Sequence, residues 1–453
     1  MNYQELKEKT KKWNQFANSD TLGSFDFYTY IVSLDSLTTN DISRFHKSFN
    51  QDFNEILNSK ANLTPEEYEQ LARILPLVIH EYTHFIDSTS TIWGLRHLNL
   101  MNEAYLSNNK HGGTEGGFIK AKRFYDHVRK IRLPDYYTTS DLKKKNKRPW
   151  GSTLTLGITF ASDGSLSNEP VFFSNFSNFD GDLLVRSPIS TVSILEASAM
   201  SQEIICHADL LHRTTGDFRQ VEESNFTEQI LSYLYNPKIT EYSVCVHVLA
   251  NRLNCKDILI AFHICSQITR LILNFPISAF DTLAEKCPIT SLINCKKGDE
   301  YELRLIDGLR NHNLGILYYL ICFALPIESY NSSQSVIAGI SSAIKNLGLN
   351  FADLQNAIKI EADELHNATQ SSKIASISSL SKAGYSNLKS ISGGQQKLSF
   401  GSLNLPPVAL SDSTQSEIFT SKTNQLQKFD LDSSFDELYD GAMWVNRFAE
   451  ACI

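Results

Sequence analysis

The chain lacks the signatures of several common enzyme classes. Its 453 residues contain no G-x-x-x-x-G-K-[ST] loop for nucleotide phosphates and no G-x-S-x-G turn for a nucleophilic serine. None of its eight cysteines forms a C-x-x-C pair, which argues against a thiolate metal cluster or a disulfide framework. We therefore expect reduced, mostly buried thiols, and neither nucleotide hydrolysis nor serine-hydrolase chemistry.

Long hydrophobic runs and excess positive charge are also missing. Residues 1–16 carry charges but no apolar core of the signal-peptide type. The most apolar stretch, residues 314–326, is too short to span a membrane. The net charge of −8 argues against general nucleic-acid binding. The sequence therefore predicts a cytoplasmic protein with no membrane partner.

The pattern of apolar residues predicts an α+β chain that is predominantly helical and has more than one domain. We expect a strand within residues 24–37 and a hairpin within 152–176. Helices are expected at residues 42–57, 189–212 and through most of 226–365. Residues 370–423 are rich in serine, which predicts a linker, a mobile loop or an irregular surface layer.

Residues 64–67 read TPEE and mark the start of a helix. Thr64 can cap it, Pro65 suits its first turn and Glu67 can complete a capping box. Pro76 is expected to end or kink this helix, and it could be the first residue of the next one.

The stretch LVIHEYTHFIDSTS, residues 77–90, contains an H-E-x-x-H motif. On a helix, His80 and His84 lie within one turn and can point two imidazoles at one ion. Zinc suits the pair because it accepts nitrogen ligands in a tetrahedral shell. The metal would lower the pKa of a bound water, and Glu81 would take the proton and pass it to a leaving amine.

The surroundings of the motif favour a metal over the alternative, a hydrogen-bonded core cluster. The apolar run at residues 74–79 predicts a buried helix, and a buried glutamate and two buried histidines need partners. A metal would satisfy all three side chains. Asp87 shares the helical stripe of the histidines, so it either orients an imidazole or is an aspartate at the end of the helix.

A catalytic zinc needs a third protein ligand and an open position for water. Asp87 and Ser90 stand where the metzincins have glycine and histidine, so the third ligand must come from elsewhere. One candidate is Glu103, nineteen residues after His84, a spacing that resembles the gluzincin aminopeptidases. The other is Glu196, in an apolar helix where a lone carboxylate would be costly.

The segment HEYTHFIDSTSTIWGL, followed by a later LEASA helix, is similar to a pattern in largely uncharacterised bacterial H-E-x-x-H proteins that resemble gluzincins. This resemblance covers roughly residues 70–210. It implies a gluzincin-like zinc metallopeptidase with a zincin-type core, in which a small mixed sheet is backed by the active-site helix and a second ligand-bearing helix. The chain departs from the gluzincin pattern because no acidic residue lies three or four places after Glu196. Ala197 and Ala199 would let the two helices approach closely, which favours Glu196 over Glu103.

Two further candidate site residues, Glu203 and His207, lie on the same side of the expected helix as Glu196. Glu203 stands about 10 Å further along the helix, too far to bind the same ion. Glu203 and His207 therefore either support the ligands, contact substrate or form a solvated, locally paired face. A peptidase also needs a group that stabilises the oxyanion, and Tyr242 and His207 are both candidates.

Residues 120–148 contain eleven lysines and arginines, with Tyr136, Tyr137 and Trp150 nearby. We interpret this segment as an exposed loop, which could hold an acidic protein substrate. Basic residues mixed with aromatic ones can also bind nucleic acid, and that is the weaker interpretation here.

We expect an N-terminal strand and helix region (1–60), a zincin-like catalytic core (61–225), a helical domain (226–366) and a serine-rich segment with the C-terminal tail (367–453). The expected activity is zinc-dependent hydrolysis of peptide bonds in a selected protein or peptide substrate. By analogy, such an enzyme is a regulatory, toxin-like or phage-defence effector. The alternative is a non-catalytic zinc-containing module that binds a protein partner.

Overall fold

A computed structural model describes most of the chain: residues 22–49, 53–108, 111–112, 115–141, 143–161, 164–328, 330–391, 398–419, 424–426 and 429–452. The chain divides into two compact units, each made of separated stretches. Unit 1 comprises Met1–Val128, Gln202–Phe226 and Ala362–Cys452; unit 2 comprises Arg129–Ser201, Thr227–Glu361 and Ile453. These units do not coincide with the four consecutive regions expected from the sequence, because the chain passes from one unit to the other several times.

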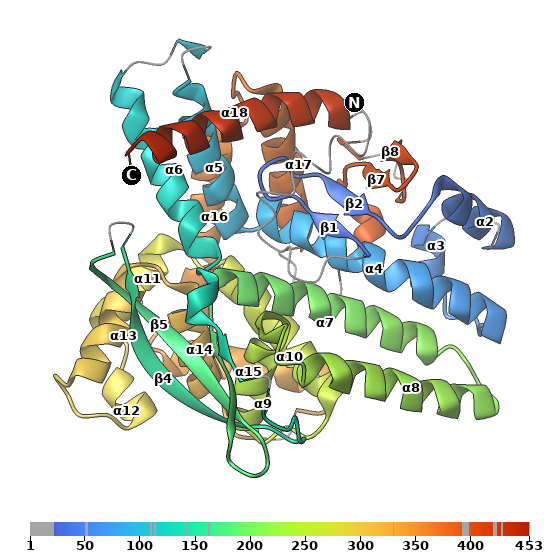
Figure 1. The fold of residues 1–453 in the computed structure, drawn as a ribbon, viewed down its shortest axis with the longest axis horizontal. Helices are drawn as coiled ribbons and strands as arrows, with labels where there is room; N and C mark the ends of the chain where they lie inside the picture. The colour runs from blue at the N-terminus through green and yellow to red at the C-terminus, as the bar shows by residue number, and fades with distance from the viewer. Residues whose placement is uncertain are drawn as a thin grey trace. The chain divides into compact units, whose positions relative to one another are not determined.

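Four helices, which Figure 1 labels, contain the positions at which the sequence passes from one unit to the other. They are α6 (Phe118–Ile131), α7 (Thr191–Leu211), α8 (Gly216–Leu234) and α16 (Phe351–Thr369). Each of these helices is continuous, so no loop or linker marks the boundaries. A prediction that looks for linkers therefore has no signal at these positions.

Unit 1 combines helices with a small mixed sheet. Its own helices are α2 (Thr39–Phe49), α3 (Phe53–Asn58), α4 (Pro65–Thr89), α5 (Ile92–Leu106), η2 (Glu115–Gly117), α17 (Ala375–Ile391), η5 (Phe400–Ser402) and α18 (Leu431–Cys452). The sheet has the strand order β1 (Ser24–Phe25), β2 (Val32–Leu34), β7 (Val408–Leu410) and β8 (Ser413–Ser416). Strand β2 runs parallel to β7, and the other neighbouring pairs are antiparallel.

The single strand expected within residues 24–37 is in fact two short strands. A turn separates them, in which the Asp26 carboxylate accepts hydrogen bonds from the backbone N–H groups of Tyr28 and Thr29. Tyr30 adopts a left-handed backbone with φ of 58°. The helix expected at residues 42–57 is likewise two helices, α2 and α3, and residues 50–52 lie outside the described part of the chain.

Helix α4 begins as expected. Thr64 accepts a hydrogen bond from the backbone N–H of Glu67, and the Glu67 carboxylate accepts one from the backbone N–H of Thr64, which completes the capping box. Pro76 lies inside α4 and does not end it, so the prediction of a new helix at this residue is wrong. The apolar residues around Pro76 are buried, and this packing outweighs the loss of one backbone hydrogen bond.

The serine-rich segment is more ordered than expected. It contains helix α17 and strand β7, and α17 packs against α4 and α5. Gly384 of α17 has no room for a side chain, because a Cβ atom there would lie 2.1 Å from the carbonyl oxygen of Thr89. The small residues of this segment therefore allow close helix packing. Residues 392–397 and 420–423 of the segment lie outside the described part.

Unit 2 has its own antiparallel sheet, with the strand order β3 (Thr139–Ser140), β6 (Leu183–Pro188), β5 (Leu166–Ser177) and β4 (Gly151–Phe160). Strands β4 and β5 are the hairpin expected within residues 152–176. The unit's own helices are η3 (Asp135–Tyr137), η4 (Thr240–Tyr242), α9 (Val244–Leu253), α10 (Ile258–Leu273), α11 (Ile277–Lys286), α12 (Ile289–Ile293), α13 (Glu300–Arg310), α14 (Leu314–Ala324) and α15 (Ser333–Asn346).

The chain is thus α+β and predominantly helical, as expected. Within the described residues, no single helix is both long and apolar enough to cross a membrane; the bent pair of α10 and α11 passes that test when the two are taken together. No disulfide joins the cysteines whose side chains the structure describes.

Candidate metal centre

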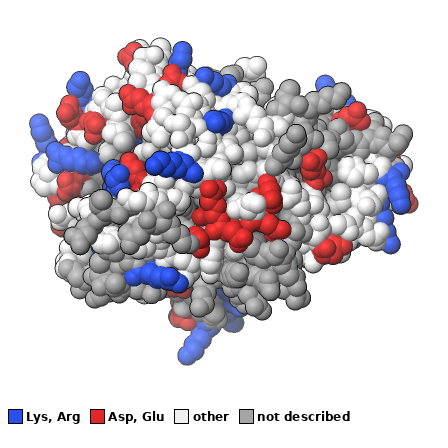
Figure 2. Space-filling view, turned by 90° about the horizontal axis from the view of Figure 1, so that it is seen from above, with Lys and Arg blue, Asp and Glu red and all other residues white. Residues whose placement is uncertain are grey.

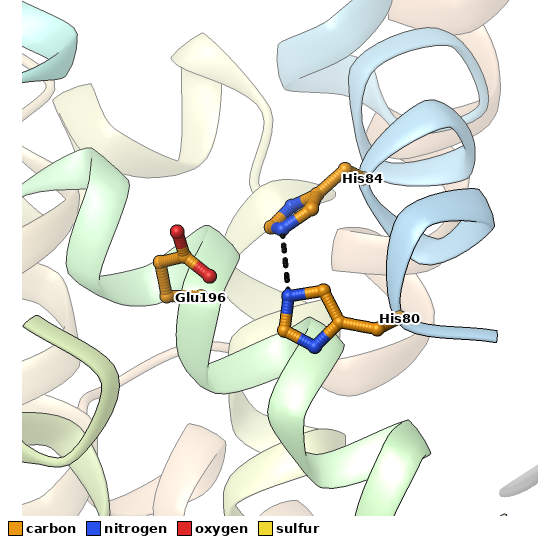
Figure 3. A group of neighbouring side chains, drawn as sticks. All are labelled: His80, His84 and Glu196. Atoms are coloured by element: carbon orange, nitrogen blue, oxygen red, sulfur yellow. Dashed lines mark hydrogen bonds between the residues drawn. The ribbon is translucent and has the colours of Figure 1, made fainter. Parts of the chain in front are cut away.

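Helix α4 places both histidines of the motif on one side, on adjacent turns. The Nε2 atoms of His80 and His84 lie 3.2 Å apart (Figure 3). This geometry follows from the spacing of four residues, which sets the two side chains one above the other. The two rings therefore face the same point, as the sequence predicts.

Helix α7 supplies a carboxylate at that point. Donor atoms of His80, His84 and Glu196 all lie within 4.8 Å of one another, and all three residues are buried (Figure 3). Glu103, on α5, is not part of this group. Two imidazole nitrogens and a carboxylate oxygen form a donor set that suits a divalent transition-metal ion. The group could hold such an ion, with Glu196 as the third ligand.

A second glutamate on α7 contacts one of the two histidines. The Oε2 atom of Glu203 lies 2.8 Å from Nδ1 of His80. Because a carboxylate can only accept, Nδ1 carries the proton and Nε2 of the neutral ring keeps its lone pair. Glu203 is seven residues after Glu196 on the same helix. Among the roles that the sequence left open for Glu203, this contact favours support of His80.

Glu196 and Glu203 both lie on α7, and Glu196 comes first in the sequence. About two helical turns separate these glutamates, and a helix fixes that spacing. Residues 192–200 of α7 are all buried, in keeping with the apolar and small side chains around Glu196.

The presumed base, Glu81, is enclosed together with the ligands. The exposed fractions are 8% for His80, 4% for Glu81, 2% for His84 and 0% for Glu196, so bulk solvent has little access to the centre. Strand β1 and the residue before it supply part of this cover. A Cβ atom on Gly23 would lie 3.0 Å from Oε1 of Glu81. No local pattern indicates this proximity, because the two residues are 58 positions apart in the sequence.

The aromatic ring of Phe25 completes this side of the centre. It stacks against the imidazole of His84, with centroids 6.3 Å apart and an interplanar angle of 25°. Phe25 is itself fully buried and meets the ring of Tyr30 edge-on. The His84 ring is therefore packed against the last residue of β1.

The remaining residues singled out in the sequence lie elsewhere. Asp87 is buried inside α4, where its backbone carbonyl accepts a hydrogen bond from Thr91, and it is not in the donor group. The ring of His207 shares a hydrogen bond of 2.9 Å with the hydroxyl of Tyr68. Burial lowers the pKa of His207, although Glu203 and another carboxylate act in the opposite direction. Tyr242 is buried in η4, and its role at an oxyanion stays a prediction.

A further carboxyl group interacts electrostatically with Glu196. Burial raises the pKa of Glu241 to about 7, the nearby Arg132 lowers it, and the charge of Glu196 raises it. The guanidinium of Arg132 lies 3.5 Å from the Glu241 carboxylate. Glu241 was not singled out from the sequence, since a lone glutamate in a short 3-10 turn carries no recognisable pattern.

Several basic side chains of residues 120–148 pair with acidic residues. Lys144 lies 3.1 Å from Asp182, and Arg148 lies 3.4 Å from Glu228. These contacts reduce the positive charge available for phosphate groups. Figure 2 shows a group of acidic side chains near the middle of one face, in keeping with the net charge of −8.

Comparisons with protein-family models, with curated proteins and with solved structures found no match to this chain. The candidate centre is therefore interpreted from its own residues and their geometry.

Proposed function

We propose that the chain is a zinc-dependent, gluzincin-like metallopeptidase that hydrolyses peptide bonds in a selected protein or peptide substrate. The observation that carries the proposal is the buried group of His80, His84 and Glu196, with Glu81 next to the first ligand in the chain. A bound divalent ion such as zinc supplies a Lewis acid that activates water and polarises a carbonyl group.

The protein's own side chains have distinct tasks in this proposal. His80, His84 and Glu196 hold the ion. Glu203 keeps the proton of His80 on Nδ1 and so directs its Nε2 lone pair towards the ion. Glu81 takes the proton released from water on its carboxylate and delivers it to the leaving amine.

One observation favours the alternative, a non-catalytic zinc-containing module that binds a protein. All four side chains of the centre are buried, as is usual for a structural site, and a catalytic site must admit substrate. The two functions differ in what Glu81 does. A structural zinc site does not use Glu81 for proton transfer. In the peptidase Glu81 is the general base, so its loss abolishes cleavage.

The test compares wild type with Glu81→Gln, which keeps the size and hydrogen-bonding capacity of the side chain but not its basicity. Zinc content is measured by mass spectrometry of the purified protein, and cleavage is measured by proteomics of cells that express each variant. We expect one zinc per chain in both proteins and cleavage products only with wild type.

Glu103→Gln is the matched control, because Glu103 is the competing glutamate and lies outside the donor group. It should retain both zinc and cleavage. Zinc in every protein with no cleavage by any of them would support the binding module instead. Absence of zinc from wild type after metal loading would refute both functions.

A further inference from the structure

The centre is closed in this conformation, and the cover includes a short segment of unit 1. Gly23 lies in a narrow gap, where a Cβ atom would be 3.0 Å from the Glu81 carboxylate and 3.0 Å from the carbonyl oxygen of Ser33. Any side chain at Gly23 would therefore meet Glu81 on one side and β2 on the other. No substrate atom can occupy this space while the segment stays in place.

The two ends of this cover differ in burial. Phe25 is fully buried and stacks on His84, so it acts as an anchor. Leu22, three residues earlier, is 55% exposed. Strand β1 is only two residues long and pairs with β2 through Ser24 and Phe25. The backbone carbonyl of Leu22 accepts a hydrogen bond from Ser36.

We propose that residues Leu22–Ser24 form a gate that closes the metal centre over Glu81, and that the gate must swing away from β2 before a protein substrate can bind. Phe25 remains packed and serves as the hinge point. With such a gate, the centre can be buried in the closed protein and still admit a substrate when the gate opens. The closed protein is then inactive. This inference rests on the proposed metal centre, and it adds a regulatory element to it.

The first test locks the gate. Ser24 and Ser33 are direct partners in the antiparallel pairing of β1 and β2, a placement suited to a disulfide between Ser24→Cys and Ser33→Cys. The oxidised double variant should show no cleavage and should release zinc to EDTA at least about tenfold more slowly than its reduced form, because local opening is blocked. The two single variants, oxidised in the same way, control for effects on native cysteines.

The second test destabilises the closed position of the gate by a substitution and does not depend on disulfide formation. In Gly23→Ala, the added methyl group would lie 3.0 Å from the backbone carbonyl oxygen of Ser33, which cannot yield easily, so the segment itself must shift by a few tenths of an ångström. We expect faster release of zinc to EDTA than in wild type. Gly151→Ala is the matched control, because a Cβ atom on Gly151 meets nothing within 4 Å. Its rate of zinc release should equal that of wild type.

Equal zinc release from the locked and reduced forms would overturn the gate, as would an unchanged rate in Gly23→Ala. A readout without metal separates this inference from the proposed function. Diethyl pyrocarbonate labelling of His80 and His84 in metal-free protein, followed by mass spectrometry, should be slower in the locked form. A wild-type protein that binds no zinc but shows this protection would refute the metal centre and retain the gate.

Discussion

At the scale of single residues, the contact between Glu203 and His80 governs the chemistry of the centre. The carboxylate holds the proton on Nδ1, so the other nitrogen of the ring is available as a ligand. Glu203 is partly exposed, with 24% of its side chain accessible, which moderates the strength of this hydrogen bond. Its main effect is therefore to select a tautomer and an orientation of the imidazole.

The first prediction concerns this contact. Glu203→Gln keeps an acceptor for Nδ1 but removes the negative charge, so zinc affinity should fall by about tenfold to a hundredfold. Competition with a chromogenic chelator measures the dissociation constant. Glu103→Gln should leave it unchanged. An identical constant for Glu203→Gln and wild type would show that Glu203 is a bystander.

The second prediction concerns Asp26 and pH. Burial raises its pKa to about 6, against hydrogen bonds from two backbone N–H groups that lower it. The folded state therefore binds this proton more tightly than the unfolded state, so the group's contribution to stability is present below about pH 4 and is lost as the pH rises towards 6. Asp26→Asn should remove this loss.

Urea denaturation of wild type and Asp26→Asn at several pH values between 4 and 7 provides the measurement. The free energy of unfolding of the variant, relative to wild type, should increase by about 2–3 kcal/mol across this range. A difference between the two proteins that does not vary with pH would contradict a raised pKa at Asp26.

Sequence reasoning at this scale succeeds where the interacting residues are neighbours on one helix. His80, Glu81 and His84 could be placed because helical geometry alone brings them together. The proximity of Gly23 to Glu81 and the stacking of Phe25 on His84 could not, because β1 packs against α4 from a distant part of the sequence and no local pattern indicates it. Between Glu196 and Glu103, small neighbours and an apolar helix indicated the residue that the structure brings to the histidines.

At the scale of secondary-structure elements, α4 is surrounded by segments from distant parts of the sequence. Strands β1 and β2, which precede α4 in the sequence, contact it, and so does α17, which follows it much later in the sequence. Strand β7 joins the same sheet as β2 through parallel pairing, more than 370 residues later. Strands of two to four residues are too short to show an alternating pattern, so the sequence alone could not place this sheet.

The third prediction tests the packing of α17 on α4. In Gly384→Ala, the new Cβ would lie 2.1 Å from the carbonyl oxygen of Thr89, so the helices must move apart. We expect a loss of about 1–3 kcal/mol in the free energy of unfolding, as for other overpacked positions. Gly151→Ala, at an open position, is the control and should change stability little. A fully stable Gly384→Ala would mean that this helix contact is loose.

At the scale of the whole molecule, the chain forms two units that share continuous helices. The boundaries between the units at residues 128, 201, 226 and 361 each lie within a helix. The sequence therefore has no linker there that would mark the division. Overall helix content and the hairpin were predictable from periodicity, whereas the division into units was not. The serine-rich segment was also difficult to interpret from the sequence. Its small residues allow close helix packing and do not mark a linker.

The fourth prediction concerns global stability and metal. An ion that binds only the folded chain stabilises it, by about 2.7 kcal/mol when free metal is one hundred times the dissociation constant. Zinc should therefore raise the melting temperature of wild type in calorimetry, and EDTA should reverse the effect. Glu196→Ala should respond much less. An equal response of both proteins would remove Glu196 from the ligand set.

The most direct measurement of the central claim is anomalous X-ray scattering at the zinc edge from a crystal of zinc-loaded wild-type protein. The account predicts one strong peak at about 2.0–2.2 Å from Nε2 of His80, Nε2 of His84 and a carboxylate oxygen of Glu196. Glu81 should lie beside the peak without binding it. No peak at these residues, or a peak bound by other side chains, would contradict the account.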